Sequence, residues 1–98
     1  MHRDEIISRI RKHADAIRAE GATELYLFGS AARDEMGAES DIDVFVECDP
    51  RRTVSLLDII GIKHIIEDDL GHRVDITTKE ALHPLMRDNI LHEAVRVL

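Results

Sequence analysis

The chain has few aromatic residues, a single cysteine and no long apolar run, and each shortage narrows what the protein can be. Three aromatics among 98 residues leave a core that must be built from Ile, Leu and Val. No apolar run approaches the roughly 20 residues that a membrane span requires. Because Cys48 is the only cysteine, no internal disulfide can form, which favours a cytoplasmic setting. The first residues interleave charged with apolar side chains, unlike a signal peptide.

Acidic residues outnumber basic ones, 20 to 13. The formal net charge of −7 argues against direct nucleic-acid binding, which depends on clustered Lys and Arg. An acidic chain can still bind a nucleoside triphosphate when Mg²⁺ screens the phosphates. With 44% apolar and 34% charged residues, the composition is that of a globular protein, and we expect one domain over residues 1–98.

The apolar pattern predicts an α/β fold with the element order α-β-α-β-α-β-α. The expected helices cover roughly 4–20, a short segment from 31, 53–70 and 84–97, and the expected strands cover 24–28, 41–47 and 73–77. In the helix over 53–70, the side expected to face the core carries Leu56, Leu57, Ile60, His64 and Ile65.

Two constraints predict how the strands pair. The Gly29-Ser30 turn ends the first predicted strand, and Asp41 begins the second. These residues can lie at one site only if the two strands run antiparallel. A helical crossover joins the second and third strands, which favours a parallel pair. We therefore expect a small mixed three-stranded sheet with helices packed on it.

The most informative stretch is Leu27 to Val46, LFGSAARDEMGAESDIDVFV. A Gly29-Ser30 turn directly follows one apolar run, and Asp41 and Asp43 stand at the head of the next. Side chains alternate along a strand, so both aspartates face the same side. Taken alone, Gly29-Ser30 is typical of an ordinary turn and the aspartate pair of a solvated strand face.

A third carboxylate makes the functional interpretation stronger. Asp75 lies between two apolar residues of the third predicted strand and should point away from the core. Three carboxylates from adjacent strands repel one another unless a cation lies between them. Oxygen-only ligands suit Mg²⁺ or Mn²⁺, and a pair of such ions is a recurrent device for displacement at phosphorus.

The turn supplies groups that complement this acidic cluster. Gly29 lets the backbone approach a phosphate closely, and the Ser30 hydroxyl and nearby N–H groups can donate to it. Arg33 follows one turn later. Two roles are open for Arg33: a charge-assisted contact with phosphate, or a structural ion pair with Asp34 or Glu35.

The pattern G-S, ten residues, D-I-D-V resembles the polymerase-β-type nucleotidyltransferase superfamily, and GSAAR…SDIDV looks like its smallest branch, the minimal nucleotidyltransferases (MNT). The resemblance covers nearly the whole chain. It implies that Gly29 and Ser30 hold the triphosphate and that Asp41 and Asp43 ligate two metal ions. It also implies that Asp75 ligates the catalytic metal and helps to deprotonate the attacking hydroxyl.

One residue departs from the family pattern. Asp34 follows Arg33 at a position where relatives often carry glycine. A carboxylate here is expected to add negative charge near the triphosphate.

The shortness of the chain bears on where the molecule that receives the nucleotidyl group can bind. No residues remain for an acceptor domain, so the acceptor site must come from a partner chain, a homodimer or a macromolecular substrate. The resemblance implies a Mg²⁺-dependent antitoxin that transfers AMP from ATP to a tyrosine of a partner HEPN RNase toxin and releases pyrophosphate. Two alternatives stay open: an antitoxin that neutralises the toxin by binding alone, and a transferase acting on a small molecule such as an aminoglycoside. No base-recognition motif indicates which nucleotide is preferred.

Overall fold

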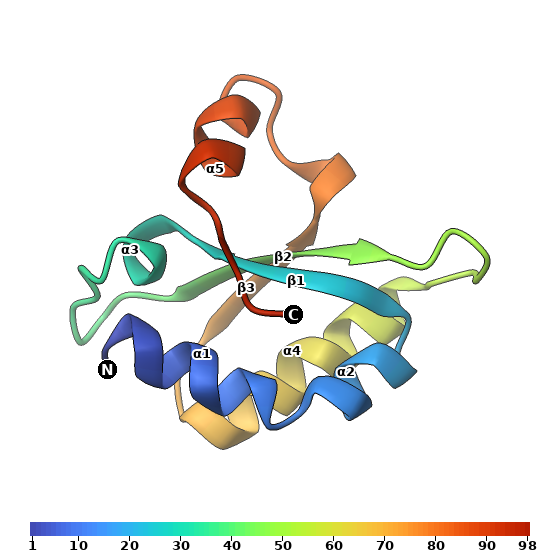
Figure 1. The fold of residues 1–98 in the computed structure, drawn as a ribbon, viewed down its shortest axis with the longest axis horizontal. Coiled ribbons are helices and arrows are strands. Elements are labelled where there is room, and N and C mark those ends of the chain that lie inside the picture. The colour runs from blue at the N-terminus through green and yellow to red at the C-terminus, as the bar shows by residue number, and fades with distance from the viewer.

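A mixed sheet with helices on both of its faces forms the centre of the structure, a computed structural model that describes residues 1–98 (Figure 1). The elements are α1 (Arg3–Arg11), α2 (Ala14–Ala19), β1 (Ala22–Phe28), α3 (Gly29–Ala32), β2 (Ile42–Cys48), α4 (Leu56–Leu70), β3 (Val74–Thr78), the 3₁₀ helix η1 (Lys79–Ala81), α5 (Arg87–Glu93) and β4 (Val95–Arg96). The strand order is β3-β2-β1-β4. As predicted, β1 and β2 are antiparallel and β2 and β3 are parallel.

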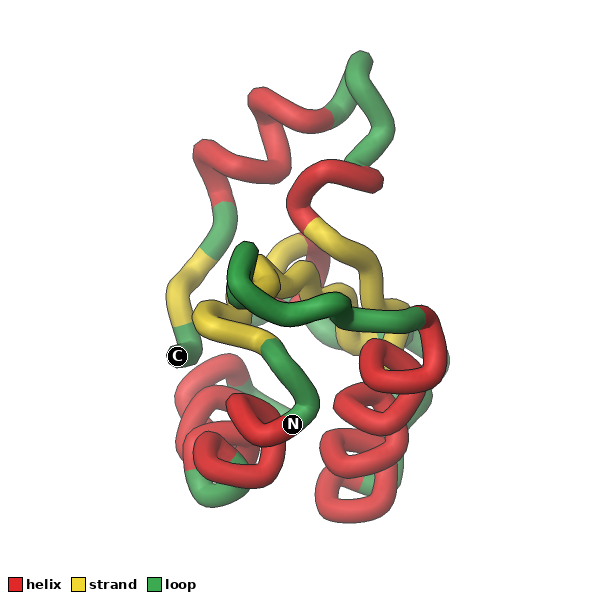
Figure 2. Tube along the Cα trace, turned by 90° about the vertical axis from the view of Figure 1, so that its right-hand side faces the viewer, coloured by secondary structure: helices red, strands yellow, loops and turns green.

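The two faces of the sheet are covered very differently. Helices α1, α2 and α4 cover one face, whereas only α5 and the segment before it stand over the other (Figures 1 and 2). The main core lies on the helical side and is aliphatic, as the shortage of aromatics predicts. A small second cluster of Phe45, Leu82 and Ile90 holds α5 against the opposite face. No helix combines the length and apolar character that crossing a membrane requires.

The predicted count of three strands was wrong, because the chain end adds a fourth. The expected helix over 84–97 is confined to Arg87–Glu93, and Val95 and Arg96 pair with β1. The N–H of Val97 continues this contact by donating to the Leu25 carbonyl at 2.8 Å. The outer edge of β1 would otherwise present unpaired backbone groups, which explains why the chain leaves the helix here.

The predicted N-terminal helix is divided into α1 and α2. Neither glycine nor proline marks the break, so the sequence carries no signal for it. The carboxylate of Asp69, near the end of α4, accepts hydrogen bonds from Arg9 at 2.9 Å and from the His13 ring at 2.8 Å. This tertiary contact ties the bend between α1 and α2 to α4.

Helix α4 starts later than predicted and buries a different side. Ser55 and Asp58 form a capping box, in which each side chain accepts a hydrogen bond from the backbone N–H of the other, so the helix begins at Leu56. The buried residues are Ile59, Ile62, Ile66 and Leu70, whereas Leu56 and Leu57 are 74% and 78% exposed and His64 is also exposed. The predicted core-facing side was therefore wrong, because apolar residues surround much of this helix and their spacing fits more than one face.

The orientation of α4 can be tested by a pair of substitutions. Ile62→Ala should lower the free energy of unfolding by about 3 kcal/mol, because it leaves a cavity in the main core. The matched substitution Leu57→Ala, on the exposed side, should change it by less than about 0.5 kcal/mol. Urea unfolding measures both values. Comparable losses in the two variants would contradict this orientation.

Candidate active site

Side chains along β2 alternate between the two faces of the sheet, so that core residues lie on one face and site residues on the other. Ile42 and Val44 are fully buried on the helical side, so Asp43 between them faces the other side. In the parallel pairing with β3, Asp43 is the direct neighbour of Asp75. The register therefore brings together two carboxylates that lie more than thirty residues apart in the sequence.

The surroundings of Asp43 disfavour the ionised form of its carboxyl group. Burial, followed by the charges of Asp75 and Asp41, raises the pKa of Asp43 to about 6, and the positive charge of Arg33 opposes this effect. At neutral pH the carboxylate is therefore mostly ionised but poorly stabilised by the chain itself. A cation beside it would remove this cost.

Asp41 stands just before β2, beside the start of β3. Its Oδ1 lies 3.7 Å from Nε of Arg73, and its side chain is 41% exposed. A hollow of about 410 Å³ opens beside it, lined by Ala38, Glu39, Ser40, Asp41, Gly71, His72 and Arg73. The side chain of Asp41 thus borders open space.

The donor set fits a divalent cation, although the carboxylates do not form a closed cluster. No group of three or more His, Cys, Asp or Glu side chains is arranged as a ready ligand set. The chemistry of the site nevertheless suits Mg²⁺, since Asp43 and Asp75 present adjacent carboxylate oxygens, and the raised pKa of Asp43 reflects burial together with repulsion from Asp75 and Asp41. The assignment of Asp41, Asp43 and Asp75 as metal ligands stays a prediction.

The Gly29-Ser30 turn packs directly against Asp43. Gly29 has a φ of +69°, and a Cβ added there would clash with the Asp43 carboxylate, lying 3.3 Å from its Cγ and closer still to Oδ2. Glycine is needed for both the backbone conformation and the close approach. The turn and the carboxylate therefore form one compact unit, with Ser30 as the second residue of α3.

Arg33 is engaged by two carboxylates, one of which the sequence did not suggest. Its guanidinium donates to Glu35 at 3.2 Å, so an ion pair with that residue is present, and to Glu93 at 2.9 Å. Glu93 also accepts a hydrogen bond from the Gly29 N–H at 3.1 Å. Glu93 lies more than sixty residues away in the sequence and in no motif, so no sequence signal could have placed it here.

Asp34 does not add its charge to the site in the way expected. Its φ of +58° is in the left-handed region, which glycine adopts more readily than aspartate. Its carboxylate accepts a hydrogen bond from the Arg3 N–H at 2.9 Å, and this contact lowers the pKa of Asp34. The side chain is thus directed to the start of α1.

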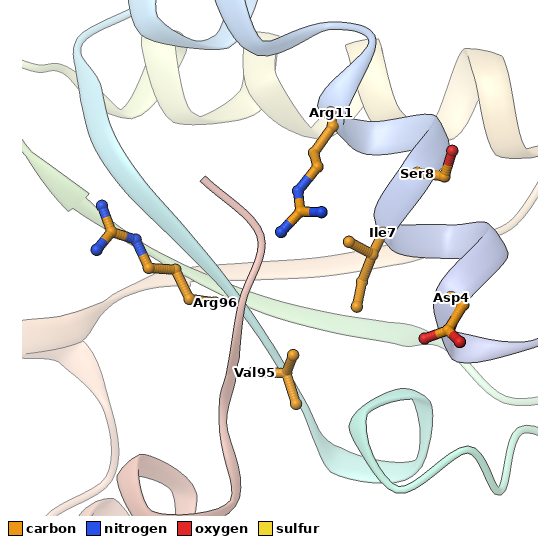
Figure 3. Close-up of a pocket in the computed structure, with 6 residues that line it drawn as sticks. All are labelled: Asp4, Ile7, Ser8, Arg11, Val95 and Arg96. Atoms are coloured by element: carbon orange, nitrogen blue, oxygen red, sulfur yellow. The ribbon is translucent and has the colours of Figure 1, made fainter.

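Another hollow, of about 340 Å³, lies between α1 and β4 (Figure 3). It is lined by Asp4, Ile7, Ser8, Arg11, Val95 and Arg96. None of the predicted site residues belongs to it. The candidate site is therefore a separate region, on the sheet between α3 and β3, where Asp41 lines the hollow of about 410 Å³ described above.

The fold is that of a nucleotidyltransferase. Residues 10–97 match the family described as "Nucleotidyltransferase domain". A candidate protein adenylyltransferase of Methanocaldococcus jannaschii is 42% identical over 88 residues, covering 90% of this chain and 92% of that protein. Protein adenylyltransferase MntA of Thermococcus cleftensis is 34% identical, with 96% and 94% of the two chains covered.

Solved structures agree with this assignment. A candidate minimal nucleotidyltransferase has a TM-score of 0.80 and 35% identity, and the match covers 97% of this chain and 95% of that one. An MNT antitoxin in complex with a tri-AMPylated HEPN toxin of Shewanella oneidensis matches with a TM-score of 0.64 over 94% of this chain and 71% of that one, and at 15% identity shares the fold. The chain belongs to the nucleotidyltransferase domain family, in its minimal branch, and is a nucleotidyltransferase.

The cost of the Asp43 charge can be measured directly. Asp43→Asn should raise the free energy of unfolding at pH 7 by about 1 kcal/mol. This is less than the pKa shift alone would give, because solvent screens the partly exposed side chain. The folded pKa of about 6 lies above the usual 3.8, so protonation stabilises the wild-type fold as pH falls between these values. The advantage of the variant should therefore be full above about pH 6 and shrink toward pH 4. Thermal unfolding across this range tests it, and a less stable variant at pH 7 would contradict it.

The close approach of Gly29 to Asp43 provides a second test. Gly29→Ala should lower nucleotidyl transfer by about a hundredfold, because the new methyl group displaces the carboxylate. Gly71→Ala is a matched control, since Gly71 has a similar φ of +67° and no atom within 4 Å of an added Cβ. Both variants should lose about 1 kcal/mol of stability through backbone strain. Equal activity losses in the two variants would show that strain, and not displacement of Asp43, is responsible.

Proposed function

We propose that this nucleotidyltransferase is a Mg²⁺-dependent antitoxin that transfers AMP from ATP to a tyrosine hydroxyl of a partner HEPN RNase toxin and releases pyrophosphate. The observation that carries the proposal is the match to protein adenylyltransferases over nine-tenths or more of both chains, together with the adjacency of Gly29, Asp43 and Asp75.

The proposed roles follow from where each group lies. Gly29 and Ser30, with Arg33, bind the triphosphate beside Asp43, and Asp41, Asp43 and Asp75 hold the metal. When bound, Mg²⁺ supplies positive charge that screens the carboxylates and the phosphates from one another. Catalysis rests mainly on orienting the two reactants and on neutralising charge.

The reaction is a single displacement at the α-phosphorus. The tyrosine oxygen forms a bond to the α-phosphorus, and the bond from the α-phosphorus to the oxygen bridging it to the β-phosphorus breaks. Pyrophosphate leaves with that electron pair. Asp75, which is exposed beside Asp43 on β3, accepts the proton of the hydroxyl.

Intact mass measurement of the partner toxin tests this function. A cognate HEPN toxin, incubated with this chain, ATP and Mg²⁺, should gain the mass of AMP, and peptide sequencing should place the AMP on tyrosine. The double substitution Asp41→Asn and Asp43→Asn should reduce the modification by about a hundredfold or more, since it removes two proposed metal ligands. No added mass on a verified partner would refute the proposal.

The same double variant separates transfer from simple occlusion. If it still neutralises the toxin fully in cells at native expression, the antitoxin acts by binding. If it fails to neutralise while still binding the toxin, the chemistry is required. Transfer of AMP to an aminoglycoside but not to the toxin would instead support the small-molecule alternative.

A further inference from the structure

Glu93, the last residue of α5, binds two groups of the candidate site at once. Its Oε1 accepts a hydrogen bond from the Gly29 N–H at 3.1 Å, and its Oε2 accepts one from Arg33 at 2.9 Å. The side chain is 30% exposed. One carboxylate therefore occupies two of the donors that the proposed function gives to the triphosphate.

The chemistry of this contact resembles that of a bound phosphate. A carboxylate, like a phosphate, presents negatively charged oxygens that accept hydrogen bonds from backbone N–H and guanidinium groups. Glu93 satisfies these donors, yet it also brings a further negative charge to a site that already contains Asp43 and Asp75, and it is one of the charges that disfavour ionised Asp43. The contact is thus favourable locally and adds to the repulsion in the site.

We propose that Glu93 is an internal stand-in for a nucleotide phosphate, which the triphosphate must displace from Gly29 and Arg33 before it can bind. This inference rests on the proposed function only for the role of these two donors. Glu93 is then a residue that sets nucleotide affinity: it competes with ligands that carry phosphates and not with adenosine. Because ATP must release Glu93 before it binds, the observed affinity for ATP is lower than the intrinsic affinity of the site.

Displacement of Glu93 also affects α5. Glu93 ends this helix, and Ala94 and β4 follow directly. The small cluster of Phe45, Leu82 and Ile90 also attaches α5 to the sheet. When Glu93 is released, the end of α5 loses its ties to α3, so nucleotide binding should loosen the segment 87–94.

Equilibrium binding of ATP with Mg²⁺ to the isolated chain tests the competition. Glu93→Gln should lower the Kd for ATP about fivefold, the effect expected from removing one partly exposed ion pair, and should leave the Kd for adenosine unchanged. Glu35→Gln is the matched control, because it removes the other carboxylate bound to Arg33 without touching Gly29. It should change the Kd for ATP by less than about twofold. Circular dichroism confirms that each variant is folded, and Glu93→Ala provides a second variant.

Hydrogen exchange gives a readout that a purely structural role would not produce. In the wild type, ATP should increase amide exchange in residues 87–94, and in Glu93→Gln exchange there should already be high without nucleotide. ATP binding that is unchanged or weaker in Glu93→Gln and Glu93→Ala, or equally tightened in Glu35→Gln, would overturn the inference, as would failure of every variant to bind ATP. These measurements need no toxin, so failed AMP transfer with tightened ATP binding would refute the proposed function alone.

Discussion

The alternation of side chains along β2 is the constraint on which both the core and the candidate site depend. Ile42, Val44 and Val46 are fully buried on one face, and they hold the sheet against α1, α2 and α4. The same period of two directs Asp43 to the opposite face. A slip of one residue in the register would bury the carboxylate and expose the isoleucine and valines, so the stability of the main core keeps the site in place.

The site itself opposes stability. Asp43 and Asp75 are neighbours across two strands, burial and repulsion raise the pKa of Asp43 to about 6, and the Gly29 turn lies against the same carboxylate. Closely packed groups that repel one another are typical of functional sites. There, a bound cation and substrate supply the opposite charge and the hydrogen-bond partners that the chain itself does not provide. Glu93 occupies the donors of Gly29 and Arg33 when no phosphate is bound, and its charge adds to the repulsion on Asp43.

Local sequence patterns were sufficient for most of the architecture. Short apolar runs located β1, β2 and β3, and the crossover between β2 and β3 correctly predicted their parallel pairing. The spacing of turn and aspartates correctly placed Gly29 beside Asp43, although the roles of these residues stay predictions. The patterns failed where several solutions were locally equivalent: apolar residues surround much of α4, and the final apolar residues fit a helix as well as the strand β4.

The sequence by itself determined the class of fold, the family and the position of the acidic strand face, because these depend on periodicity and on short motifs of adjacent residues. Only the tertiary structure decided which side of α4 is buried, that the sheet has a fourth strand, and that Glu93 rather than Asp34 reaches the Gly29 turn. Each of these depends on contacts between residues distant in the chain, where the packing of whole elements and the need to pair backbone groups outweigh local preference.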